Sequence, residues 1–447
     1  MTENLKFYLT AIMLLFAPLI AGGKSLPSLL GLELIGTLLL GIITWQDTLG
    51  QRLSKLAWFT LFLGLSIPIL YLIPIPATWW EVLPGRAKYV EGLNWYQYFT
   101  NTSPWLSLSL VPEKTVHALL ALIPLLAIFL ATLTLSSKNI LKLTYLLIIL
   151  AVTEAILGIL NYTAHTGFIF TFGLNNREIS PSVSGTYINR DHFSALLYMT
   201  LPLTLGEFFY RVGNKAIRYN YKEKGIQTHD ILGLLLIITA NIFLIIGAVL
   251  SGSRAGIFLI VLAIAVSSLL FASHIGGKSS ASLTSSLIVA ILGISLSIGV
   301  IPILNRFIGQ DPLEDARWEF YQLTWTAIKQ FFPLGTGPST FQEVYRTLQP
   351  YDQIDFLNHV HNDYLELVFE IGLLGVVFTL LFFLVYIQGW LNLRTTAWDK
   401  TRFLKVASGI SIGLLLIHTL VDFNFHVPAN ALIFSMLLGI FIKRKEP

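Results

Sequence analysis

Long apolar runs recur along the whole length of the chain, and polar stretches separate them. A helix that crosses a bilayer needs about 20 predominantly apolar residues. Windows of this kind lie near residues 6–23, 27–45, 56–74, 115–135, 140–161, 192–210, 231–250, 256–273, 284–303, 364–389, 403–421 and 428–442. Hydrophobic residues make up 54% of the chain and charged residues 12%, which is more apolar surface than one soluble core can bury. The pattern predicts an all-α polytopic membrane protein with about twelve transmembrane helices, built as a single domain over residues 1–447.

The N-terminus and the composition exclude several classes of protein. The first apolar run, residues 6–23, has no small-residue cleavage site and is followed at once by a second run, so we interpret it as a retained span. The chain contains no cysteine, which excludes disulfides, thiolate metal sites and a cysteine nucleophile. The net charge of +4 is not concentrated on a soluble domain, and we therefore expect no nucleic-acid partner.

Basic residues between the apolar runs indicate how the chain crosses the membrane. They fall consistently on alternate sides, at Arg52 and Lys55, Lys138 and Lys142, Arg211 to Lys224, Arg394 to Lys405, and Lys443 to Lys445. Cytoplasmic connections of membrane proteins carry an excess of lysine and arginine. We therefore predict that these segments and both termini are cytoplasmic.

With this orientation, the three longest polar segments lie on the outer side, at residues 75–113, 162–191 and 304–362. Connections of that length are usually functional or disordered, and these contain tryptophans, which disordered segments rarely carry. We expect them to fold over the membrane surface and to hold the chemistry. The first contains IPIPATWWEVLPGR, which is typical of an interfacial aromatic belt, with stacking against a sugar as the alternative.

The strongest candidate for catalysis ends the largest outer segment, where His359 and His361 precede a long apolar run. The imidazole of a histidine exchanges a proton near neutral pH and can serve as a general base. The alternative is a cluster in which Asn362 or Asp363 only caps the following helix. Capping and catalysis are compatible, so we expect at least one of the two histidines to be functional.

A second candidate is the sequence SGSRAG at residues 251–256, which stands between two apolar runs with almost no connecting loop. An arginine in such a place is costly unless it meets an anion or a carboxylate. Flanking glycines let backbone N–H groups face an anion, and the next helix N-terminus adds a favourable partial charge. Ser253 and Arg254 therefore indicate a diphosphate site, with a short turn and a surface-reaching Arg254 as the alternative.

Two further arginines stand beside carboxylates near the expected membrane surface. One lies in YINRDHF at residues 187–193, and the other is Arg317, two residues after Asp315. Taken alone, each is equally well explained by an ion pair that anchors a loop. Together with Arg254 and His361 they would form an outward-facing basic cluster, which suits a lipid-linked diphosphate. No HExxH, Walker or EF-hand pattern occurs and no outer DxD pair is placed for a sugar nucleotide, so we predict no metal and no cofactor.

The sequence resembles the O-antigen ligase family, also called the Wzy_C family of ligases and polymerases, from about residue 180 to residue 445. The resemblance is carried, in family order, by NRDHF at 189–193, SGSRAG at 251–256, PLGTGPSTF at 333–341, and His361-Asn362 followed by nine residues and Gly372-x-x-Gly375. The two glycines share one helical face, and we expect them to let a neighbouring helix approach closely. The resemblance implies a GT-C-like helical fold in the bacterial inner membrane, with a large helical periplasmic loop. It also implies a metal-independent inverting glycosyltransferase whose active site is periplasmic.

The family pattern assigns catalytic roles to Arg254, Arg317 and His361, with Arg306 or Arg346 as alternatives to Arg317. His361 would orient or deprotonate the acceptor hydroxyl, while the arginines would stabilise the departing polyprenyl diphosphate. We expect the remaining substrate contacts to come from Asn189, Arg190, His192, Ser253, His359, Asn362 and Tyr364. The segments that contain these residues should therefore converge at the outer side.

The implied reaction moves a glycan from undecaprenyl diphosphate to lipid A-core. A polymerase that joins repeat units and an oligosaccharyltransferase that modifies protein share the same motifs and stay open. We favour the ligase because the His-Asn signature fits it well and because we expect no soluble domain after the last span. A secondary transporter is the rival from another class, but its binding residues would lie at the bilayer midplane, whereas the polar residues here gather at the outer rim.

Overall fold

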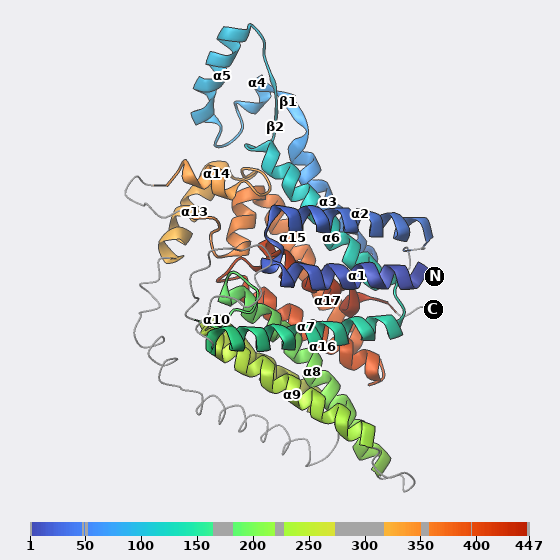
Figure 1. The fold of residues 1–447 in the computed structure, drawn as a ribbon. Helices are drawn as coiled ribbons and strands as arrows, with labels where there is room; N and C mark the ends of the chain where they lie inside the picture. The colour runs from blue at the N-terminus through green and yellow to red at the C-terminus, as the bar shows by residue number, and fades with distance from the viewer. Residues whose placement is uncertain are drawn as a thin grey trace.

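The computed structural model describes residues 2–46, 49, 52–163, 182–219, 228–272, 317–349, 357–394 and 396–444. Its long helices are α1 (Thr2–Leu19), α2 (Leu26–Gln46), α3 (Lys55–Leu72), α6 (Pro112–Thr134), α7 (Ser137–Thr163), α8 (Arg190–Tyr219), α9 (Thr228–Ser251), α10 (Arg254–Ala272), α15 (Asp363–Leu393), α16 (Lys400–His418) and α17 (Pro428–Ile442). They form one bundle, and both chain termini lie at the same end of it (Figure 1).

Shorter elements connect these helices. They are η1 (Ala21–Gly23), β1 (Pro74–Pro76), α4 (Ala77–Trp80), α5 (Ala87–Thr100), β2 (Trp105–Ser107), α13 (Arg317–Phe331), α14 (Phe341–Arg346) and η3 (Asn424–His426). Strands β1 and β2 pair antiparallel, with Ile75 opposite Leu106. Helices α13 and α14 lie at the end of the bundle away from the termini, and α4, α5 and the two strands project beside it (Figure 1).

The predicted membrane class is confirmed. Within the described ranges, eight helices are long and apolar enough to cross a membrane. On α2, Leu30, Leu34 and Leu38 are 55%, 63% and 56% exposed at a spacing of four residues, so this helix turns an apolar stripe outward, as lipid requires. Every predicted window coincides with a helix except 284–303, which lies outside the described residues. The number twelve and the GT-C class stay predictions.

Helix α8 is the centre of the bundle rather than one of the lipid-facing spans. Residues Phe193 to Leu201 are buried on every side, and α9, α10 and α16 pack around them. Its interior hydroxyls have hydrogen-bond partners, as when Thr200 donates to the carbonyl of Leu196 at 2.7 Å. A helix enclosed by protein can carry more polar residues than one that faces lipid, which explains why α8 is not among the eight apolar spans.

Several predicted features lie outside the described residues. They are the window 284–303, Arg306, Asp315, most of the segment 162–191, and the parts of 304–362 at 304–316 and 350–356. Within the first outer segment, Trp79, Trp95 and Trp105 are 67%, 55% and 66% exposed. Exposed indoles suit both an aromatic belt and sugar stacking, so that choice stays open.

The prediction that Gly372 and Gly375 admit a neighbouring helix is wrong. Gly372 has a φ of 54° and breaks the helical geometry of α15. A side chain there would clash with the carbonyl of Pro333, and the N–H of Leu373 donates to that carbonyl at 2.8 Å. The atoms nearest to a Cβ on Gly375 would belong to its own helix, the first being the carbonyl oxygen of Leu367. The break leaves backbone groups without helical partners, and the turn at 333–337 supplies them.

Candidate active site

Three carboxylates lie on one face of the first turns of α15: Asp363, Glu366 and Glu370, spaced three and four residues apart. Each carboxylate accepts backbone N–H groups from a different outer segment. Their partners are the N–H groups of Phe425 for Asp363 (3.1 Å), Val360 for Glu366 (3.0 Å), and Ser339 and Phe341 for Glu370 (2.8 and 3.0 Å). The start of α15 therefore fixes the segments 357–362, 422–426 and 337–341 relative to one another.

His361 stands just before α15 in a left-handed conformation, with a φ of 59°. Asn362 caps the helix, since its side-chain oxygen accepts the N–H groups of Tyr364 and Leu365 at 3.1 and 3.0 Å. This geometry places Nδ1 of His361 3.3 Å from Oδ1 of Asp422. A carboxylate at Nδ1 selects the tautomer with a proton there and leaves Nε2 able to accept one.

Asp422 is only 2% exposed and faces three imidazoles. Besides His361, the Nε2 atoms of His192 and His418 lie 3.5 and 3.8 Å from its Oδ2. Burial by itself raises the pKa of Asp422, but the imidazoles of His192 and His361 hold this pKa well below its usual range. The carboxylate therefore stays ionised at neutral pH and can stabilise a proton on His361.

A buried polar network continues from Asp422 into the bundle. Nδ1 of His418 lies 2.9 Å from the hydroxyl of Tyr198 and 3.0 Å from the side-chain amide of Asn424. The amide of Asn430 in turn donates to the side-chain oxygen of Asn424 at 3.0 Å and to the carbonyl of His192 at 3.1 Å. The network joins α8, α16 and α17, and it orients the histidines because buried polar groups need their partners.

The ring of Phe423 lies at the centre of the histidines. Its centroid is 4.8 Å from that of His192, 4.5 Å from that of His359 and 4.7 Å from that of His361. The ammonium of Lys24 lies 4.9 Å from the same centroid. Residues from the α1–α2 connection, α8, the segment before α15 and the segment after α16 therefore meet at one aromatic ring.

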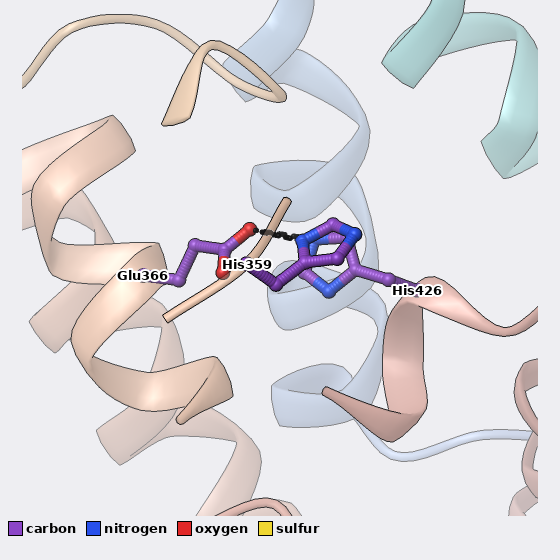
Figure 2. A group of neighbouring side chains, drawn as sticks. All are labelled: His359, Glu366 and His426. Atoms are coloured by element: carbon purple, nitrogen blue, oxygen red, sulfur yellow. Dashed lines mark hydrogen bonds and ion pairs between the residues drawn. The ribbon is translucent and has the colours of Figure 1, made fainter. Parts of the chain in front are cut away.

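His359 and His426 both approach Glu366 (Figure 2). Nδ1 of His359 lies 2.8 Å and Nε2 of His426 3.3 Å from Oε1 of Glu366. Nδ1 of His426 also lies 3.0 Å from Asp363. Burial by itself lowers the pKa of His426, but Glu366 and Asp363 raise it to about 10, whereas burial and the charge of His426 lower the pKa of His359. At neutral pH His426 is therefore an imidazolium between two carboxylates, and His359 is neutral.

The same three side chains are a possible metal-binding group, since the donor atoms of His359, Glu366 and His426 all lie within 4.8 Å of one another. A metal would need Nε2 of His426 without its proton. This proton already offsets part of the charge of the two carboxylates, so a divalent cation would have to displace it. Chemistry without a metal stays a prediction. If a chelator inhibited the protein, these three residues would be the candidate metal site.

The SGSRAG segment packs against the start of α8. A Cβ on Gly256 would overlap the hydroxyl of Ser194, so the first turns of α10 and α8 touch. Ser253 caps α10, its hydroxyl accepting the N–H of Gly256 at 3.0 Å. Asn189 likewise accepts the N–H of Asp191 at 2.8 Å. Arg254, the first residue of α10, therefore lies beside the turn that carries Arg190 and His192.

Arg317 is the first residue of α13, and this helix touches the histidine segment. Tyr321 stands one turn later on the same face, and its hydroxyl donates to the carbonyl of His361 at 2.8 Å. Arg317 and Asp191 both lie close enough to His418 to influence it electrostatically. The four predicted segments are thus linked by contacts, although they are far apart in the sequence.

Residues 239–380, about a third of the chain, match the family described as O-antigen ligase. This span contains Arg254, Arg317 and His361 together. This part of the chain is similar to the O-antigen ligase family. Members of this family are glycosyltransferase-like membrane enzymes that act on glycans and lipid-linked substrates. No curated protein matches the chain.

Some residues predicted to contact substrate also have structural roles that the fold shows. The side-chain oxygens of Asn189, Ser253 and Asn362 serve as helix or turn caps. The hydroxyl of Tyr364 donates to the carbonyl of Leu416 at 2.9 Å. These contacts show how the four residues shape the site, and their binding of substrate stays a prediction.

Sequence reasoning left unassigned several residues that connect the predicted ones. Asp422 and His426 stand in the short sequence DFNFH, which could line the same cavity but which a polar hairpin turn explains equally well. Asp363, Glu366 and Glu370 did carry a signal, because their spacing puts three acids on one face of an otherwise apolar helix. Lys24 had none, as a single lysine between two spans is ordinary.

Proposed function

We propose that this protein is an O-antigen ligase, which transfers a glycan from undecaprenyl diphosphate to lipid A-core on the periplasmic face of the bacterial inner membrane. The observation that carries the proposal is the pair of His361 and the buried, ionised carboxylate of Asp422, 3.3 Å apart. His361 is 27% exposed while Asp422 is 2% exposed. The imidazole is thus reachable by a substrate, and its supporting carboxylate is not.

In the proposed reaction, the acceptor hydroxyl loses its proton to Nε2 of His361 as its oxygen attacks the anomeric carbon. The bond from that carbon to the diphosphate oxygen breaks, and the diphosphate departs with the bonding electrons. Asp422 stabilises the imidazolium that forms, through the proton on Nδ1. Attack opposite the leaving group inverts the anomeric centre.

The leaving group needs neutralisation of charge more than it needs a proton, because a diphosphate is stable as an anion. Arg254 begins α10 beside the start of α8, and Arg317 begins α13 one turn from the contact with His361. Guanidinium groups bind phosphate oxygens in a planar, bidentate manner. We assign both arginines to the departing diphosphate, without a metal.

The arrangement of the chain supports a periplasmic site with cytoplasmic termini. Both termini lie at one end of the bundle, and α13 and α14 lie at the other (Figure 1). The basic residues Arg52 and Arg444 also meet at the end of the termini, where the N–H of Arg444 donates to the carbonyl of Arg52 at 3.2 Å. The excess of positive charge at that end favours its placement in the cytoplasm.

A polymerase would use the same donor and the same motifs, so the products must separate the two activities. In a strain that lacks this protein, a ligase predicts unmodified lipid A-core together with intact long polymer on the carrier lipid. Lipid A-core that carries a single repeat unit would instead identify a polymerase. Unchanged lipid A-core and carrier-linked glycan would contradict both.

The chemistry is tested by transfer from purified undecaprenyl-diphosphate glycan in the presence of a chelator. We expect full activity with chelator, and a loss on the order of a hundredfold or more in His361→Ala. Arg254→Ala should lose nearly all activity, and Arg254→Lys should retain part of it because charge remains without the planar fork. The matched control is His117→Ala, an exposed histidine of α6, which should stay fully active. Inhibition by the chelator would contradict the metal-free mechanism.

A further inference from the structure

The connection between α1 and α2 brings a lysine into the candidate active site from far outside the family match at 239–380. Lys24 follows Ala21, Gly22 and Gly23, whose φ angles are 54°, 72° and 81°. Left-handed backbone is disfavoured for a residue with a side chain such as Ala21. Glycine adopts this backbone readily, so Ala21 is the residue whose conformation the surroundings must hold.

The surroundings of the turn are visible. A Cβ on Gly22 would lie 3.4 Å from Val427 and 3.5 Å from Tyr187, and one on Gly23 would lie 3.0 Å from Pro428. The turn is thus wedged between the segment before α8 and the start of α17. Both of these flank the candidate active site, so the direction in which the chain delivers Lys24 is fixed by packing.

The side chain of Lys24 points to the histidines. Its ammonium lies 4.9 Å from the centroid of Phe423, the ring that also contacts His192, His359 and His361. Lys24 is partly buried, and within the described part of the chain it forms no ion pair. Asp422 acts on Lys24 electrostatically, but this carboxylate is already paired with imidazoles.

A partly buried ammonium without a carboxylate is costly unless an anion accompanies it. Its position adds a second argument, because in the proposed topology the α1–α2 connection is on the outer side, where lysine is depleted. An anion that enters with the substrate would satisfy both arguments. A cation–π contact with Phe423 could by itself explain the position of Lys24 as a support for that ring. It does not explain why a charged group should face the histidines.

We propose that Lys24 binds the diphosphate of the lipid-linked donor, as a third cation beside Arg254 and Arg317. This assignment rests on the proposed function, since it takes the donor to be a polyprenyl diphosphate. Lys24 would lie on the side of the diphosphate that faces Phe423 and the α1–α2 turn. It would then help to orient the leaving group relative to His361.

The test uses the full-length protein in nanodiscs and undecaprenyl diphosphate without a glycan. Lys24→Met removes the charge but keeps most of the apolar stem, and Lys24→Arg keeps the charge. We expect Lys24→Met to weaken binding by about tenfold to a hundredfold, the range for losing one charge-assisted hydrogen bond. Lys24→Arg should remain within a few-fold of the wild type. Undecaprenol, which has no phosphate, should bind all variants alike.

A matched control and a kinetic measurement complete the test. Lys114→Met removes a lysine of α6 that pairs with Glu343 at 2.7 Å, and it should bind the diphosphate like the wild type. In transfer assays Lys24→Met should raise KM for the donor and leave KM for the acceptor unchanged. Unimpaired diphosphate binding by a folded Lys24→Met protein would overturn the proposal, as would a rise in acceptor KM alone. Failure of the wild type to bind undecaprenyl diphosphate would instead contradict the proposed function.

Discussion

Two carboxylates at opposite ends of the bundle contrast in their partners. At the end of the termini, Glu207 of α8 is 9% exposed and binds Arg211 at 2.7 Å and Lys400 at 3.4 Å. The hydroxyl of Tyr145 donates to the same carboxylate at 2.9 Å. At the other end, Asp422 is 2% exposed, and its partners are histidines at 3.3 to 3.8 Å.

The difference between the two sites is whether the cation can exchange a proton. Arginine and lysine keep their charge at all physiological pH values, so Glu207 forms a permanent ion-pair cluster that links α7, α8 and α16. Histidine gives up and takes a proton near neutral pH. A buried acid in an apolar protein is a functional candidate by default. The comparison gives our proposal a criterion: histidine partners fit the proposed chemical role of Asp422, and arginine and lysine partners fit a structural role for Glu207.

The comparison is tested most strongly by Asp422→Asn. The amide keeps the size of the carboxylate but cannot stabilise an imidazolium, and its N–H₂ group favours the wrong tautomer of His361. We expect the transfer rate to fall on the order of a hundredfold or more with little change in donor binding. The measurement is single-turnover transfer alongside binding of undecaprenyl diphosphate. Normal turnover by the Asp422→Asn protein would leave Asp422 only a structural role.

A smaller effect is expected from His426→Gln, and it is measured as a change in thermal stability with pH. The folded pKa of His426 is raised to about 10, above the value of about 6.5 in an unfolded chain. Its contribution is therefore complete below pH 6.5 and is lost as pH rises through 10. The groups that face it are Asp363, Glu366, Glu370 and His359.

We expect the wild type to lose thermal stability in detergent between about pH 7 and about pH 10.5 by more than the His426→Gln protein does. Charge-assisted hydrogen bonds of this kind contribute about 1.5–3 kcal/mol, so the variant should already be less stable at neutral pH. Lysines and tyrosines elsewhere titrate in the same window, and the difference between the two proteins removes their contribution. Parallel stability curves would show that His426 is not the imidazolium of this site.

The smallest effect on activity is expected from Glu207→Gln. The substitution would remove the carboxylate that pairs with Arg211 and Lys400, so the midpoint temperature of unfolding should fall. The transfer rate should stay within about twofold, because Glu207 lies at the opposite end of the bundle from His361. A rate loss comparable with that of Asp422→Asn, measured in protein that remains folded, would remove the distinction between the two sites.

Much of the architecture was accessible from local pattern. Apolar length and hydropathy are properties of a single segment, which is why the predicted windows match helices of the described chain. The helix caps were predictable for the same reason, because Asn362 and Ser253 are residue types that are preferred just before a helix. Gly372 was misjudged because glycine spacing does not reveal whether a helix or a turn will fill the space beside it.

Sequence by itself determined the membrane class, the helices and the residue types from which a lipid-diphosphate site could be built, among them Arg254, Arg317 and His361. The tertiary structure decided which side chains from distant parts of the sequence contact one another. Asp422 reaches His361 across 61 residues, and Lys24 reaches Phe423 across nearly the whole chain. Such pairs depend on how α1, α8, α15 and α16 end at a common surface. Hydropathy constrains the length of each span but not the rotation or neighbours of its last turn, so only packing could bring these side chains together.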